Sequence, residues 1–134
     1  MTRSTTRLPL GLWVVALLLT AAGLNALHQA SNEILDPEPR SLMLGMLQFA
    51  TATSAIIAAV AIVRKHRWAP FAIAAWGAIA AAMVVLLEPL GFVDAVDRIG
   101  LWQGAAAILA SATVMIWYVR RRSAAPSDAQ NATT

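Results

Sequence analysis

Four long apolar runs, separated by short charged gaps, constrain this chain more than any other feature of its sequence. The runs cover residues 8–30, 42–63, 69–87 and 99–119. An α-helix of about 20 residues spans the ~30 Å hydrocarbon core of a bilayer, because it rises about 1.5 Å per residue. The sequence therefore predicts an all-α fold, a four-helix transmembrane bundle within residues 1–122, with short loops.

The charged gaps alternate in sign. Eight of the ten basic residues lie before the first run, between the second and third, or after the fourth: Arg3, Arg7, Arg64, Lys65, Arg67, Arg120, Arg121 and Arg122. The first and third gaps are acidic and hold one arginine each: Glu33, Asp36, Glu38 and Arg40, then Glu88, Asp94, Asp97 and Arg98. Basic loops stay cytoplasmic, so we expect an N-in/C-in, multi-pass protein. The alanine-rich, lysine-poor composition is typical of a GC-rich bacterium, which makes the inner (plasma) membrane the expected location.

The first run has two interpretations. A basic start followed by an apolar stretch also opens a signal peptide, and Ala21, Ala22 and Ala26 resemble a cleavage site. The apolar stretch continues to Leu27, whereas a signal-peptide core has about 7–15 residues. We therefore expect an uncleaved first helix, with cleavage and three remaining spans as the alternative.

Composition excludes several classes of chemistry. Only 13% of the residues are charged, against about 25% in soluble domains. The chain has no cysteine, which excludes thiol redox chemistry and thiolate metal ligation. Its two histidines, His28 and His66, fall at opposite ends of the predicted spans, so one subunit cannot hold a haem between them. We expect no cofactor, no metal and no nucleic-acid partner, because the basic clusters lie where orientation and anionic lipid require them.

The gaps and the C-terminal end carry further local predictions. Residues 31–41 contain an Asp-Pro-Glu-Pro segment, which predicts an extended, non-helical turn. Residues 64–67 leave room only for a tight turn between two antiparallel helices. Residues 123–134 are small and polar, and we expect a disordered cytoplasmic tail.

Two short segments indicate an internal repeat. Gly-Met-Leu-Gln at 45–48 opens the second run, and Gly-Leu-Trp-Gln at 100–103 opens the fourth. Read on without gaps, residues 65–67 fall on residues 120–122, and both triplets are basic. A tandem pair of helical hairpins would explain the match. Chance similarity between apolar sequences is the alternative.

Small residues at four-residue spacing are candidates for helix packing. Lipid is as apolar as leucine, so transmembrane helices associate through close backbone approach. The third run carries Ala74, Ala78 and Ala82, and the fourth carries Gly100 and Gly104. The glycine pair either packs within the subunit or joins it to another.

Polar side chains within the runs cluster near one surface. Asn25 and His28 lie late in the first run, Gln48 about 9 Å into the second, Gln103 about 6 Å into the fourth, and Glu88 just beyond the third. Polar groups inside a membrane are costly and are therefore candidates for function. We predict that these five residues form a ligand-binding layer in the outer leaflet. The alternative is that the two glutamines hydrogen-bond across helices as packing contacts.

Three functions remain open at this point. The favoured one is a non-enzymatic accessory, assembly or scaffold module that packs against other membrane subunits or itself. The second is binding or transport of a small apolar or amphipathic molecule, a lipid or a quinone, through the polar layer. The third is an enzyme at the periplasmic surface with His28 and Glu88 as an acid–base pair. A proton-driven exporter is disfavoured because no acidic residue lies near the centre of a run.

Overall fold

The computed structural model describes residues 8–35, 38–89, 91 and 98–123 as four helices and their connections. The helices are α1 (Leu10–Ile34), α2 (Pro39–Val63), α3 (Ala69–Leu86) and α4 (Arg98–Ser123), and the described residues contain no strand. All four are long and apolar enough to cross a membrane. This confirms the prediction of an all-helical chain with four candidate membrane spans.

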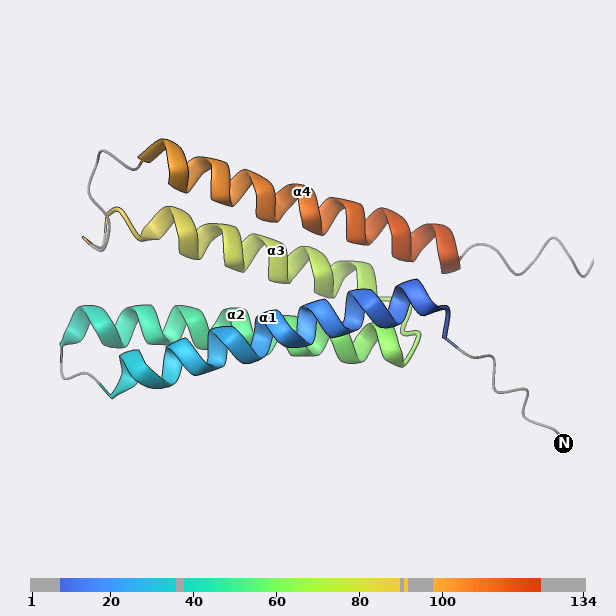
Figure 1. The fold of residues 1–134 in the computed structure, drawn as a ribbon, viewed down its shortest axis with the longest axis horizontal. Helices are drawn as coiled ribbons and strands as arrows, with labels where there is room; N and C mark the ends of the chain where they lie inside the picture. The colour runs from blue at the N-terminus through green and yellow to red at the C-terminus, as the bar shows by residue number, and fades with distance from the viewer. Residues whose placement is uncertain (1–7, 36–37, 90, 92–97, 124–134) are drawn as a thin grey trace, which may run out of the picture.

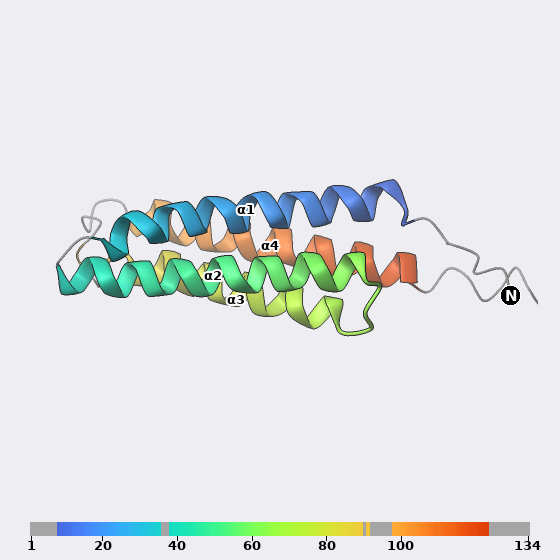
Figure 2. The same ribbon diagram turned by 90° about the horizontal axis from the view of Figure 1, so that it is seen from below.

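Consecutive helices lie side by side and run in opposite directions (Figures 1 and 2). Contacts join α1 to α2, α2 to α3, and α3 to α4. The start of α1 and the end of α4 therefore lie at the same end of the molecule (Figure 1). We call this the basic end, since it holds Arg64, Lys65, Arg67, Arg120, Arg121 and Arg122. The opposite, acidic end holds Glu33, Glu38 and Glu88. Which end faces the cytoplasm stays a prediction.

The acidic-end connection between α1 and α2 is shorter than the sequence predicts. Residues 31–34 continue α1, and α2 begins at Pro39, so the expected non-helical turn over 31–41 is wrong at both of its ends. The prolines explain the error. Glu38 has an extended backbone, with φ −75° and ψ 132°, as a residue before proline prefers. Pro39 then occupies the first turn of α2, where the missing N–H is not needed. The predicted tail at 124–134 lies outside the described residues.

The basic-end turn between α2 and α3 is as tight as predicted. The N–H of His66 donates to the carbonyl of Ala61 at 2.8 Å, and that of Lys65 donates to Ile62 at 3.0 Å. This pair of bonds is a Schellman motif, which ends a helix with a residue in the left-handed conformation. Lys65 is that residue, with φ 52°, at a cost of roughly 1–2 kcal/mol for a side chain other than glycine. The turn places His66 beside the last turns of α2.

Two glycines bring α1 and α2 into close contact. A Cβ added to Gly23 of α1 would lie 3.1 Å from the carbonyl oxygen of Ala52. A Cβ added to Gly45 of α2 would lie 2.8 Å from Cγ1 of Ile34 and 3.3 Å from the carbonyl oxygen of Ala30. Only glycine permits backbones this close without a shift. The hairpin of α1 and α2 is therefore packed through its glycines at two heights.

Two more glycines shape the remaining contacts. Gly77 of α3 faces α4, where an added Cβ would lie 2.7 Å from Cβ of Ala112. Gly11 of α1 lies under the phenol ring of Tyr118 from α4, and a side chain at Gly11 would collide with the Tyr118 hydroxyl. The aromatic ring thus joins the first and last helices at the basic end.

Candidate functional site

The five residues of the predicted polar layer fall into different environments. Gln48 is buried, Glu88 is half-buried, and Asn25, His28 and Gln103 are exposed. The five side chains therefore do not line a single enclosed cavity. Ligand binding by these residues stays a prediction. The buried Gln48, the half-buried Glu88 and the three exposed residues have to be considered separately.

Gln48 is the buried member, and its amide is only partly satisfied. Its side chain is 6% exposed, and Nε2 donates to Oε1 of Gln29 on α1 at a long 3.4 Å. Its Oε1 is buried and has no hydrogen-bond partner among the described residues. A buried acceptor without a partner costs about 1–3 kcal/mol. The site therefore has unused capacity for a hydroxyl, an N–H group or a water molecule.

Gln29, the hydrogen-bond partner of Gln48, was not among the residues predicted from the sequence. It lies one residue beyond His28, at the acidic end of α1, so its depth matches that of Gln48 on the antiparallel α2. The sequence does contain a signal for this contact, because both glutamines lie at a similar depth in neighbouring antiparallel spans. The packing alternative, in which a glutamine bonds across helices, thus holds for Gln48, but its partner is Gln29 rather than Gln103.

Hydroxyls next to Gln48 are largely satisfied within α2. Thr51 donates to the carbonyl of Leu47 at 2.9 Å, and Ser54 donates to that of Thr51 at 2.9 Å. The Thr51 hydroxyl also lies 3.8 Å from Sδ of Met83 on α3. Back-bonding of this kind is usual for hydroxyls in membrane helices. These hydroxyls therefore do not compete for a ligand at Gln48.

Trp76 supplies a second buried polar atom without a partner. The residue is 9% exposed and packs in the main core, which includes Leu19, Ile62 and Ile73. Its indole Nε1 is buried and has no acceptor among the described residues. Trp76 thus serves core packing, while its N–H remains a donor without an acceptor in the described part of the chain.

Glu88 binds an arginine at the acidic end. Nε of Arg98 donates to both carboxylate oxygens of Glu88, at 2.8 and 3.1 Å, and Nη2 of Arg98 contacts Oε1 as well. No hydrogen bond or ion pair joins His28 to Glu88 in the described part of the chain, so the acid–base pair considered from the sequence is not formed. The ion pair links Glu88, just beyond the end of α3, to the start of α4.

The predicted packing residues mostly lie on outward faces. Ala74, Ala78 and Ala82 are exposed, and α3 packs through its other side. That side consists of Ala69, Ala72, Ile73, Trp76, Gly77, Ala80 and Ala81. The glycine pair of α4 is divided: an added Cβ at Gly104 would lie 3.6 Å from Val84, whereas one at Gly100 would meet nothing within 4 Å.

One side of α4 forms an exposed stripe at helical spacing. We call it the outer stripe of α4; its members are Gly100, Gln103, Ala107, Ala110, Val114 and Trp117, all of them exposed. Spacings of three and four residues place them on one face. The buried positions of α4, at Ala105, Ala112 and Val119, follow a seven-residue spacing on the opposite side. The last helix therefore presents a long face that no described residue covers.

Within the described residues, no three His, Cys, Asp or Glu side chains are grouped so that they could hold a metal ion.

Comparison with known proteins gives no further guide to the site. The chain matches no protein-family model, and its comparison with curated proteins and with solved structures gives no significant match. The assignment of function therefore depends on the residues of this chain alone.

Proposed function

We propose that this chain is a non-enzymatic membrane subunit that binds another transmembrane helix through the outer stripe of α4. The observation that carries the proposal is the position of Gln103. Its amide is exposed on a membrane-spanning helix, about 7 Å from the helix start. No other described residue hydrogen-bonds to it.

The surroundings of Gln103 suit a helix partner. An amide that faces lipid loses its hydrogen bonds to water, which favours a partner that restores them. Gly100, one turn away, has open space where a side chain would be. Ala107 and Ala110 continue the small surface. Small residues beside an amide are what close transmembrane helix contacts require, and such an interhelical hydrogen bond contributes about 0.6–2 kcal/mol.

Two hydroxyl groups in the middle of α4 do not need a partner. The hydroxyl of Ser111 donates to the carbonyl of Ala107 at 2.8 Å, and that of Thr113 donates to Leu109 at 2.8 Å. Both are therefore satisfied within their own helix. The Gln103 amide, by contrast, has no such bond, and an interacting helix would satisfy it.

Native mass spectrometry after gentle extraction tests this proposal. We expect the wild-type chain to be recovered in a complex, either with another membrane protein or with itself. Gln103→Leu and Gly100→Leu should each reduce the complex at least threefold, since one removes the hydrogen bond and the other blocks close approach. Thr113→Val is the matched control: it removes an exposed polar group from α4 outside the outer stripe, and should leave the complex intact. A wild-type monomer, or equal complex in all variants, would overturn the proposal.

A second candidate function is favoured by the free acceptor of Gln48. The buried Oε1 calls for a donor, so a ligand here would carry a hydroxyl or N–H group, as an amphipathic alcohol or a reduced quinone does. Lipid extracts of purified wild-type protein and of Gln48→Leu, compared by mass spectrometry, test this. A hydroxyl-bearing molecule retained by the wild type and lost in the variant supports ligand binding; identical extracts refute it.

A further inference from the structure

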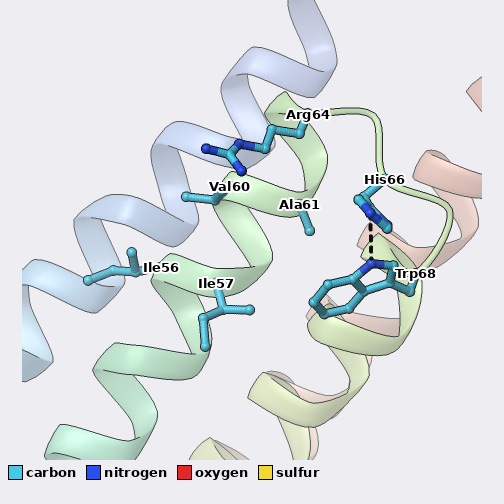
Figure 3. A pocket seen from close by; sticks show the side chains of 7 residues that line it. All are labelled: Ile56, Ile57, Val60, Ala61, Arg64, His66 and Trp68. Atoms are coloured by element: carbon cyan, nitrogen blue, oxygen red, sulfur yellow. Dashed lines mark hydrogen bonds between the residues drawn. The ribbon is translucent and has the colours of Figure 1, made fainter.

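A groove at the basic end lies between the last turns of α2 and the start of α3 (Figure 3). Its volume is about 300 Å³. Ile56, Ile57, Val60 and Ala61 form an apolar wall along α2. The first three are exposed, so the groove opens to the side of the protein, where lipid chains would lie.

Polar groups occur only at one end of this groove. Arg64 and His66 lie there, and Trp68 faces α2 from the start of α3 (Figure 3). The indole Nε1 of Trp68 donates to Nε2 of His66 at 3.2 Å, and the two rings meet edge to face with centroids 5.0 Å apart. The Arg64 side chain leaves the end of α2 on the side of Val60 and points away from the His66 ring (Figure 3).

We infer that the groove binds a phospholipid with an anionic headgroup. One acyl chain lies against Ile56, Ile57 and Val60, and the phosphate contacts the guanidinium of Arg64. The position suits this, since tryptophan and basic side chains at helix ends occupy the headgroup region. The size suits one chain segment rather than a whole lipid, because 300 Å³ is at the lower limit of small-molecule sites.

Charge complementarity favours an anionic lipid over a zwitterionic one. The three acidic side chains that the structure describes, Glu33, Glu38 and Glu88, all lie at the acidic end. No described carboxylate therefore competes for Arg64. The Schellman turn at Lys65 fixes the backbone next to Arg64, so the point from which this side chain leaves α2 is set before the lipid arrives.

The other basic cluster at the same end provides a control. The guanidinium of Arg121 lies over the Trp117 ring at 5.1 Å, and that of Arg122 lies over Tyr118 at 5.7 Å. These arginines face aromatic rings of their own helix, and the aliphatic wall of α2 is not beside them. A substitution at Arg121 thus makes the same charge change at the same end without altering the groove.

Lipid titration of the purified full-length chain, followed by native mass spectrometry, tests the site. The probes are phosphatidylglycerol and phosphatidylcholine with identical acyl chains. We expect the wild type to bind phosphatidylglycerol roughly fivefold more tightly or better, as one basic residue near anionic lipid contributes about that factor. Arg64→Gln should remove this preference. Ile57→Trp should weaken both lipids equally, because it fills the apolar part and keeps the charge.

The controls decide between a site and a general effect of charge. Arg121→Gln should leave the preference unchanged, and equal losses in Arg64→Gln and Arg121→Gln would overturn the inference. So would a wild type without preference between the two lipids. Inorganic phosphate at matched ionic strength should not displace phosphatidylglycerol, and displacement would assign the polar end of the groove to free phosphate instead. Thermal unfolding in detergent confirms that each variant is folded, which is expected because Ile57, Arg64 and Arg121 are all exposed.

Discussion

Residues 45–48 of α2 and 100–103 of α4 share the pattern Gly-x-x-Gln near the start of a span, but their surroundings are opposite. Gly45 and Gln48 are buried, with Gly45 against α1 and Gln48 bonded to Gln29. Gly100 meets nothing within 4 Å, and Gln103 is exposed. The difference follows from the number of neighbouring helices. α2 packs on both α1 and α3, whereas α4 packs mainly on α3. The same residues therefore form a buried contact between helices in one place and an exposed face in the other.

The two hairpins also differ in register. Gly45 meets the last turn of α1, at Ile34, whereas in α4 the glycine nearest to α3 is Gly104, one turn further on, at Val84. If the hairpins arose by duplication, the second has moved by about one helical turn relative to the first. In α4, Gly100 and Gln103 are both exposed on the outer stripe. The duplication itself stays a prediction.

Leucine at each glycine gives the largest expected contrast. Gly45→Leu should lower the free energy of unfolding by about 2–3 kcal/mol, because the new side chain meets the Ala30 carbonyl as well as the Ile34 side chain. Gly100→Leu should not lower it, since nothing lies within 4 Å of the added Cβ and leucine favours a helix more than glycine does. Unfolding of the monomeric protein in mixed micelles measures both. Similar losses at the two glycines would show that α4 is packed on its outer stripe as well.

Sequence reasoning could find the spans because length and apolarity alone define them. It could not choose the packing face, for a physical reason that α3 illustrates. Ala72, Ala80 and Ala81 are buried while Ala74 and Ala78 are exposed, although the residue type is the same. In lipid, an outward position needs to be no more polar than an inward one. The stripe of Ala74, Ala78 and Ala82 was therefore visible in the sequence, but its direction was not.

The sequence indicated which polar residues matter but not their partners. Gln48 stood out because an amide is costly in a span, and its burial agrees with that reasoning. The partner of Glu88 could not be chosen in advance, because Arg98 is ten residues away across a loop and His28 was equally near in expected depth. The glycines that pack, Gly23 and Gly77, were missed because neither belongs to a four-residue repeat of glycines.

Alanine substitutions at Gly45, Gly100 and Gly104 should change the free energy of unfolding by less than Gly45→Leu does, and in opposite directions. Gly104→Ala and Gly100→Ala should each raise the free energy of unfolding by up to about 0.5–1 kcal/mol through helix propensity, because the added Cβ is in ordinary contact or free. Gly45→Ala should lower it, because its Cβ would be too close to Cγ1 of Ile34. A loss at Gly104 equal to that at Gly45 would place the two glycines in equivalent contacts and remove the difference in register.

Leucine substitutions at Gln48 and Gln103 should have the smallest effects on the free energy of unfolding of the isolated chain. They also separate a role within the subunit from a role between subunits. Gln48→Leu should change the free energy of unfolding by no more than about 1 kcal/mol, because the loss of one long hydrogen bond to Gln29 is offset by removal of a buried acceptor without a partner. Gln103→Leu should leave the monomer unchanged within about 0.5 kcal/mol, since its amide has no bond to lose within the described chain. The same unfolding assay, run on the monomer and on the extracted complex, separates the cases. If Gln103→Leu weakens the complex but not the monomer, the amide acts between subunits; if it weakens the monomer, its partner lies within this chain and the face of α4 is already covered.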